Sequence, residues 1–344
     1  MDGEGNSCLP RYIALRLVSA VTMALVASVV IFLISNFVPG DPVLAQLGDI
    51  LASDPAVVAQ WRAKWGLDLP LWDRYWIFLS GLLHGDLGMS IATRRPVIED
   101  IAQYAPATVE LATVAFLLSL AIGIPLGIAA AVWRDSVVDA AARAISLLGV
   151  SAPTFWLAFI MLAIFYGWLG WAPGPGRLDP IAFPPEGPTG FFLIDSVLAR
   201  DWETFHDTVA HLTLPALVLA AATLGLITRT TRAAMLDCLQ QDYVRVARAK
   251  GLRDRAVVLR HALRNALVPV VTLGGLAYAN LLTGAVMTET IFSWPGLGRY
   301  TFRSAAALDF PAIMGITLVV SATYLLVNLV VDLSYALLDP RVRR

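Results

Sequence analysis

The sequence has few of the charged side chains that soluble proteins carry on their surface. Only 15% of its 344 residues are charged, whereas about 25% is usual for a soluble domain. The mean hydropathy is +0.69, and long uncharged runs recur along the chain. In lipid, only helices and closed barrels satisfy their own backbone hydrogen bonds. The composition therefore excludes an ordinary soluble domain and predicts an integral membrane protein.

Lysine is nearly absent, and this excludes one class of enzyme. A P-loop requires G-x-x-x-x-G-K-[ST], in which the lysine reaches the nucleotide phosphates. The chain has only Lys64 and Lys250, and an alanine precedes each of them. Paired carboxylates and a nucleophile elbow are not evident either. We therefore expect no catalytic residues and no cofactor in this chain.

Cysteine and histidine are equally scarce. The two cysteines, Cys8 and Cys238, form no C-x-x-C pair, and the four histidines fall in different loops or at the mouth of a helix. We interpret both cysteines as ordinary small residues, since disulfides are rare on the cytosolic side to which both are assigned. No metal site is expected.

Six uncharged runs are long enough to cross a hydrocarbon layer about 30 Å thick. They cover residues 17–37, 111–133, 144–169, 208–228, 265–288 and 310–331. The first exceeds the apolar core of about 7 to 15 residues that a signal peptide carries, and no A-x-A site follows it. We interpret it as a retained anchor and predict a bundle of six transmembrane helices.

Positive charge sets the expected orientation. With the amino terminus inside, the interior segments hold 16 of the 25 Lys and Arg residues and the exterior segments hold 9. An excess of Lys and Arg is typical of cytoplasmic loops. Both termini are therefore predicted to be cytosolic.

This orientation divides the chain into segments. Two cytosolic ends enclose a first transmembrane helix, an exterior subdomain of short helices and a five-helix core with one cytosolic and two exterior loops. Their residues are 1–12 and 339–344 for the ends, 13–37, 38–105 and 106–338 for the three parts, and 234–266, 170–207 and 289–309 for the loops. Residues 173–188 are too rich in Pro and Gly to be helical.

Aromatic residues are concentrated in the predicted exterior subdomain, at Trp61, Trp65, Trp72, Tyr75 and Trp76. Such residues form a belt at a membrane interface or present a docking surface to another protein, and the pattern leaves both interpretations open.

Acidic residues lie only at the edges of the predicted spans. We expect Glu110, Glu289 and Asp332 to be interfacial rather than buried relays. Proton-coupled carriers usually carry ionisable groups at membrane depth. A self-contained secondary transporter or channel is therefore the remote alternative.

One segment, "DYVRVARAKGLRDRAVVLRHALRNALVP" (242–269), carries seven positive residues. Positive-inside bias explains part of this charge, and binding of nucleic acid or anionic lipid is a second interpretation. The pattern favours a third. Tyr243, Val246, Ala247 and Lys250 follow an i, i+3, i+4, i+7 helical spacing, and Gly251 is suited to end that helix with a positive φ. We predict a helix–Gly–helix elbow that docks into the groove of a partner.

Small residues within the spans, as in "AIGIPLGIAAA" and "VTLGGLAYAN", favour close helix packing. In the second of these runs Gly274 and Gly275 mark a bend or a face that lines a pathway. We expect these glycines and Asn280 to be pathway residues.

The basic segment resembles the EAA-type coupling loop of ABC import permeases, in the version of the dipeptide and oligopeptide family (B-type, first-permease subunit). Relative to the broader E-A-A-x3-G pattern, Arg245 and Val246 occupy the Glu and first Ala places, and only Ala247 and Gly251 match. Eight further stretches resemble the family in order along the chain. They are "FLISNFVPGDP", "GDLGMS", "PATVELA", "SAPTFWLA", "HLTLPALVLA", "RTTRAAML", "ETIFSWPGLG" and "YALLDPRVR".

The resemblance implies a type I ABC importer permease fold, a place in the bacterial inner membrane and a set of partners. These would be a second similar permease, two ATPase subunits that hold ATP and Mg, an exterior solute-binding protein and the bilayer, with no nucleic acid. Contact with the ATPase is expected through the elbow, at Tyr243, Arg245, Val246, Ala247, Arg248, Lys250, Gly251 and Arg253. The implied cargo is a di- or oligopeptide, and nickel chelates, glutathione and oligosaccharides are the alternatives within the family.

Overall fold

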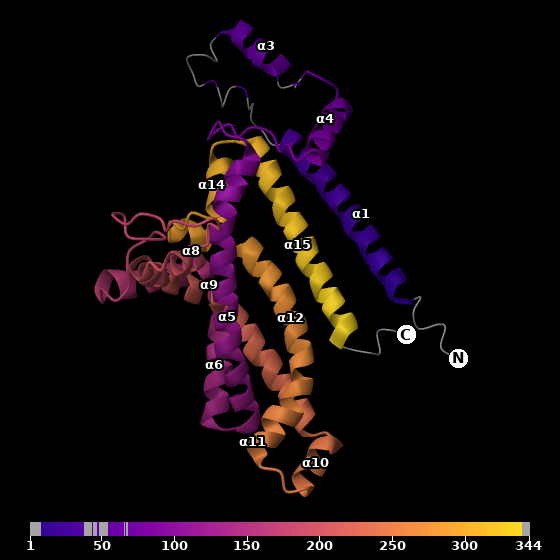
Figure 1. Ribbon diagram of the computed structural model, residues 1–344, viewed down its shortest axis with the longest axis vertical. Helices are drawn as coiled ribbons and strands as arrows, with labels where there is room; N and C mark the ends of the chain where they lie inside the picture. Colours follow the sequence, from indigo (N-terminus) through magenta and orange to yellow (C-terminus); the bar gives the residue numbers. More distant parts are fainter. Residues whose placement is uncertain are drawn as a thin grey trace. The chain divides into compact units, whose positions relative to one another are not determined.

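The computed structural model describes residues 8–37, 43, 47, 54–64, 66 and 68–338. Across these residues the secondary structure is helical and contains no strand, apart from one isolated bridge between Met89 and Pro96. The helices form two compact units, Met1–Pro106 with Pro295–Leu326 and Ala107–Trp294 with Val327–Arg344 (Figure 1). The all-helical prediction is confirmed.

The first unit contains the short helices predicted between the first two spans. Its elements are α1 (Cys8–Phe37), α3 (Pro55–Lys64), α4 (Leu71–Leu83), α14 (Leu297–Ala306), the start of α5 (Val97–Val132) and most of α15 (Phe310–Leu338). Val97 and Ile101 of α5 pack against Tyr300 of α14 and Ile316 of α15 to form its core. Outside the described residues lie the stretch "VPGDP" (38–42), Trp65, residues 1–7 of the predicted end 1–12, and the predicted end 339–344.

The second unit is built around α9 (Trp202–Leu239), which packs against α6, α7, α8 and α12. The other elements are α6 (Val137–Ser151), α7 (Thr154–Met161), η1 (Leu162–Trp168), α8 (Phe192–Ala199), α10 (Asp242–Ala249), α11 (Asp254–Ala256), η2 (Val257–Ala262), α12 (Leu263–Gly284) and α13 (Val286–Ile291). At 38 residues, α9 is about 57 Å long, so it extends well beyond a hydrocarbon layer.

Glycines bring α9 into backbone contact with its neighbours. A Cβ added at Gly225 would lie 2.5 Å from the backbone oxygen of Ser146 in α6. A Cβ at Gly127 of α5 would lie 2.7 Å from the backbone oxygen of Thr228. Helices in lipid pack through such small residues, so the packing role predicted for the glycines of α5 is confirmed.

Three of the six predicted spans, residues 17–37, 208–228 and 310–331, each lie within one helix, and residues 111–133 extend one residue beyond the end of α5. The predicted span 265–288 runs past the end of α12 at Gly284 into α13. Four described helices are long and apolar enough to cross a membrane, namely Val97–Val132, Trp202–Leu239, Asp254–Gly284 and Phe310–Val330. The continuous third span predicted for residues 144–169 is wrong. There α6 and the α7–η1 helix meet at an angle of 106°, because Pro153 forces Ala152 into an extended conformation with ψ of 126°.

Two acidic residues expected at the membrane edge are instead buried. Glu110 forms an ion pair with the buried Arg177, and Glu289 accepts a 2.6 Å hydrogen bond from the Thr108 hydroxyl. Both pairings join residues far apart in the sequence, which hydropathy does not predict. The side chain of Asp332 lies outside the described residues.

Candidate functional site: an exposed elbow after α9

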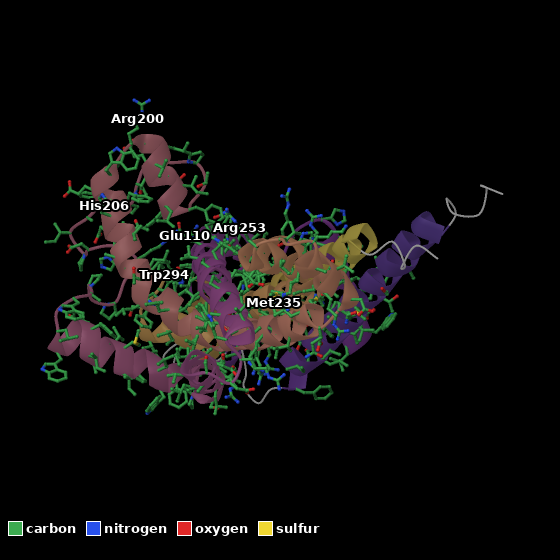
Figure 2. All side chains as sticks on the ribbon, turned by 90° about the horizontal axis from the view of Figure 1, so that it is seen from below. Glu110, Arg200, His206, Met235, Arg253 and Trp294 are labelled. Carbon is green, nitrogen blue, oxygen red and sulfur yellow. The ribbon has the colours of Figure 1, made fainter. Side chains whose placement is uncertain are left out.

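The segment that follows α9 turns sharply twice and returns to the bundle as α12. We call residues 242–256, comprising α10, the turn at Gly251 and α11, the elbow. In Figure 1 it lies at the end of the second unit. Figure 2 views the chain from this end and labels Arg253 of the elbow.

Gly251 ends α10 in the way the sequence predicts. Its φ is +75°, its N–H donates to the carbonyl of Arg248 at 2.9 Å, and the N–H of Leu252 donates to the carbonyl of Ala247 at 3.4 Å. This pair of bonds is the Schellman motif, which satisfies the last carbonyls of a helix and favours glycine in the left-handed position. A Cβ at Gly251 would meet nothing within 4 Å. Among the described residues, none therefore lies against this position of the turn.

The face of α10 that packs against the bundle differs from the predicted one. Val244 and Ala247 are buried in a cluster with Met235 of α9 and Val257, Val258, Ala262 and Ala266 of the following helix. Of the four residues predicted to share a face, only Ala247 is buried, and Val246 is 52% exposed. Eight residues form barely two turns, so several apolar spacings fit them, and the start of η2 decides which one is buried. The i, i+3 pair Val244 and Ala247 is a signal that the sequence analysis overlooked.

The outward side of the elbow combines exposed apolar groups with unbalanced positive charge. Tyr243, Val246 and Leu252 are exposed. All seven basic residues of the segment are exposed as well, at Arg245, Arg248, Lys250, Arg253, Arg255, Arg260 and Arg264. Arg245 pairs with Asp242 at 3.4 Å and Arg248 with Asp254 at 3.5 Å. Ion pairs this exposed contribute little to stability, so both arginines remain available to a partner.

Tyr243 connects α10 to the helices beside it. Its hydroxyl interacts with the side chains of Asn265 and Cys238, and burial of that hydroxyl is the largest cause of a raised Tyr243 pKa. Tyr243 itself is 39% exposed. It therefore lies beside residues of α9 and α12 and also contributes to the outer surface.

The elbow continues into the bundle without a break in the helix. From Asp254 to Gly284 the chain is helical without a break, and its η2 portion takes the wider π-helical form. Such π-helical turns are frequent at functional sites. The elbow is thus joined to α12 by an unbroken helix.

The residues predicted to line a pathway lie on different sides of α12. Gly274 is buried, and a Cβ there would be 3.5 Å from the ring of Phe116 and 3.9 Å from Ile227. Gly275 is half-buried and Asn280 is exposed. The structure thus places Gly274 in helix packing, and the pathway role of all three residues stays a prediction.

Comparison with known proteins matches nearly the whole chain. Residues 123–344 match the family "Binding-protein-dependent transport system inner membrane component", and residues 9–112 match its companion amino-terminal family. The chain is 50% identical over 316 residues to the probable D,D-dipeptide transport system permease protein DdpB of Escherichia coli K12, covering 92% of each chain.

Other relatives also match over nearly the whole of both chains. The chain is 42% identical to the di/tripeptide transport system permease protein DppB of Pseudomonas aeruginosa, covering 96% of this chain and 98% of the relative. It is 37% identical to the glutathione transport system permease protein GsiC of Pectobacterium atrosepticum, with the same coverage. A solved structure of the MetNI methionine ABC transporter matches at 16% identity with a TM-score of 0.49, covering 68% of this chain and 93% of that chain. The chain belongs to the family of binding-protein-dependent transport system inner membrane components, with the type I ABC importer permease fold.

Proposed function

We propose that this chain is a permease subunit of an ABC importer that couples to a separate ATPase through the elbow. The observation that carries the proposal is the elbow's two-sided construction. Val244 and Ala247 fasten it to the bundle, while Val246 and Leu252 leave an apolar surface exposed beside the arginines. Exposed apolar groups within a charged rim are the usual anatomy of a protein interface.

The proposed partners follow from the separation of the permease from its ATPase. Two ATPase subunits would hold ATP and Mg, a second homologous permease would complete the pathway, and a solute-binding protein would deliver the cargo outside. Arg245, Arg248 and Arg253 would face acidic groups of the ATPase, contributing to its orientation more than to affinity. In this arrangement the elbow, both termini and Cys238 face the cytosol.

The proposed cargo is a dipeptide, because the relatives at 50% and 42% identity carry dipeptide and di/tripeptide names. Glutathione is the second candidate, since a relative at 37% identity carries that name. Uptake into proteoliposomes that contain the chain and its partner subunits would separate the two. We expect a labelled dipeptide to accumulate with ATP and excess unlabelled glutathione not to compete.

The coupling itself is tested by leaving subunits out. Purified alone, this chain is expected to bind and hydrolyse no ATP, and uptake should require the co-expressed ATPase subunits. Substrate-stimulated hydrolysis by the chain free of other subunits would overturn the proposed function.

A further inference from the structure

Helix α4 has apolar side chains on two sides, and among the described residues one of these sides is packed against α1 while the other is exposed. The Tyr75 hydroxyl lies 3.0 Å from the Ser28 hydroxyl of α1. The ring of Phe32 lies 5.3 Å from that of Tyr75 and 5.9 Å from that of Phe78. Elsewhere on α4 large apolar groups are exposed, at Trp72, Trp76, Ile77 and Leu83, with Trp76 at 61% and Leu83 at 79%.

The contacts with α1 give the depth of α4. α1 ends at Phe37, so Phe32 and Ser28 lie about 8 Å and 14 Å before that end at 1.5 Å per residue. Half of a hydrocarbon layer is about 15 Å. At the same level α1 exposes Val26, Val30, Leu33 and Ile34, which is the surface expected to face lipid. α4 therefore packs on α1 within one leaflet and beside lipid-facing residues.

The segment after α4 gives an independent measure of depth. A Cβ at Gly88 would lie 3.7 Å from the side chain of Pro311, and a Cβ at Gly315 would lie 3.4 Å from that of Leu87. Both α15 residues lie in its first two turns, within about 8 Å of its start at Phe310. Ser90 then hydrogen-bonds to Asp309, just before α15 begins. The chain thus leaves the level of the spans between Leu87 and Ser90.

After its first turn, α4 carries no charged residue. Its charged residues, Asp73 and Arg74, occur in the first turn, and the stretch "YWIFLSGLL" (75–83) is uncharged. The Ser80 hydroxyl donates to the carbonyl of Ile77 within the helix, so that polar group is satisfied. At 13 residues the helix is too short to cross a bilayer, and an apolar segment of this length is typical of a re-entrant or interfacial position. Trp and Tyr are enriched at that level.

We propose that α4 is embedded in the leaflet nearest to Phe37, with Trp76, Ile77 and Leu83 against lipid. In the proposed orientation this is the outer leaflet. The lipid-facing surface of α1 then continues onto α4, and part of the segment predicted as an exterior subdomain belongs to the membrane. The competing interpretation is that a soluble protein, and not lipid, covers this side of α4.

The test places one nitroxide label at a time on α4. In a chain with Cys8→Ser and Cys238→Ser, the variants Ile77→Cys and Leu83→Cys are labelled and the purified complex is reconstituted into phospholipid nanodiscs. Val30→Cys of α1 is the lipid control. Phe183→Cys is the water control, since Phe183 is also apolar and is exposed in a loop of the other unit. Power-saturation spectroscopy compares collisions with oxygen, which concentrates in lipid, and with a water-soluble nickel chelate.

We expect the oxygen-to-nickel ratio at positions 77 and 83 to match Val30→Cys and to exceed Phe183→Cys several-fold. Values equal to those of Phe183→Cys would overturn the proposal. So would protection that occurs only after the solute-binding protein is added, because that protein would then be the occupant. Quenching of tryptophan fluorescence by brominated phospholipid provides a second measurement without cysteines. The quenched fraction should fall in Trp76→Phe, and an unchanged fraction would contradict lipid contact.

Discussion

The guanidinium of Arg177 lies 2.6 Å from the carboxylate of Glu110, although the two residues are 67 positions apart. Both are buried, the Arg177 guanidinium carbon lies 3.5 Å from the centroid of the Phe192 ring, and the other Glu110 oxygen accepts the N–H of Leu193 at 2.8 Å. Burial lowers the pKa of Arg177 and the neighbouring Glu110 opposes that shift. The pair fixes the proline-rich loop and the start of α8 to α5.

Removing one partner of this pair should destabilise the second unit. Glu110→Ala leaves a buried guanidinium without its carboxylate, and breaking a buried ion pair costs about 3 to 5 kcal/mol. The double variant Glu110→Met with Arg177→Met should recover most of this loss, because neither charge is then left unpaired. The order of stability of the three proteins is measured by thermal unfolding, with the folded species detected by size-exclusion chromatography in detergent. Equal stability of Glu110→Ala and the parent would contradict the role given to the pair.

The close approach of α6 and α9 predicts a contrast between two glycines in helices. A Cβ at Gly225 would lie 2.5 Å from the carbonyl oxygen of Ser146, whereas at Gly284 it would meet nothing within 4 Å. We expect Gly225→Ala to cost about 1 to 3 kcal/mol, because the backbones must separate. Gly284→Ala is the matched control and should leave the unfolding temperature unchanged. Indistinguishable unfolding curves would show that α6 and α9 do not pack this closely.

The sequence predicts the features that local chemistry determines. Gly251 takes the positive φ expected of it, and the uncharged runs 17–37, 208–228 and 310–331 each lie within one helix. It fails where the outcome depends on distant residues. The partner of Glu110 lies in another segment, and the packed face of α10 is chosen by Val257 and Val258. The bend at Pro153 lies between these cases. The proline is evident in the sequence, but the run 144–169 is apolar on both sides of it, so hydropathy alone predicts one continuous span.

Two nearby valines of α10 distinguish an effect on folding from an effect on ATPase docking. Val244 is fully buried and Val246 is 52% exposed, so the same substitution has different consequences two residues apart. Val244→Asp should destabilise the protein by several kcal/mol, about the cost of burying an unpaired polar group. Val246→Asp should leave the unfolding temperature unchanged and reduce co-purification of the ATPase. A Val246→Asp protein that retains full ATPase binding would show that this face of α10 makes no contact.

The excess of positive charge predicts that Cys8 and Cys238 both face the cytosol. A membrane-impermeant thiol reagent applied to intact cells should leave both unmodified until the membrane is permeabilised. Phe183→Cys, in a loop predicted to be outside, should react in intact cells and controls for the reagent. Labelling of either native cysteine from outside would invert or break the six-span topology.

The central claim, that the elbow receives the ATPase, is tested most directly by comparing two glycines in left-handed turns. Gly251 has a φ of +75° and Gly170 a φ of +62°, and a Cβ at either would meet nothing within 4 Å. A side chain therefore costs about 1 to 2 kcal/mol of backbone strain at each position, and only Gly251 is proposed to face a partner. A basic patch that acts by charge alone would instead be disabled by Arg245→Ala, Arg248→Ala and Arg253→Ala together, and would tolerate Gly251→Trp.

The measurement is co-purification of the ATPase subunits, together with ATP-dependent uptake, for Gly251→Trp and Gly170→Trp at equal membrane abundance. We predict that Gly170→Trp retains ATPase binding and uptake. Gly251→Trp should lose both, because a large side chain would separate two closely packed surfaces. Retention of ATPase binding and uptake by Gly251→Trp would contradict the claim that the elbow is the coupling site.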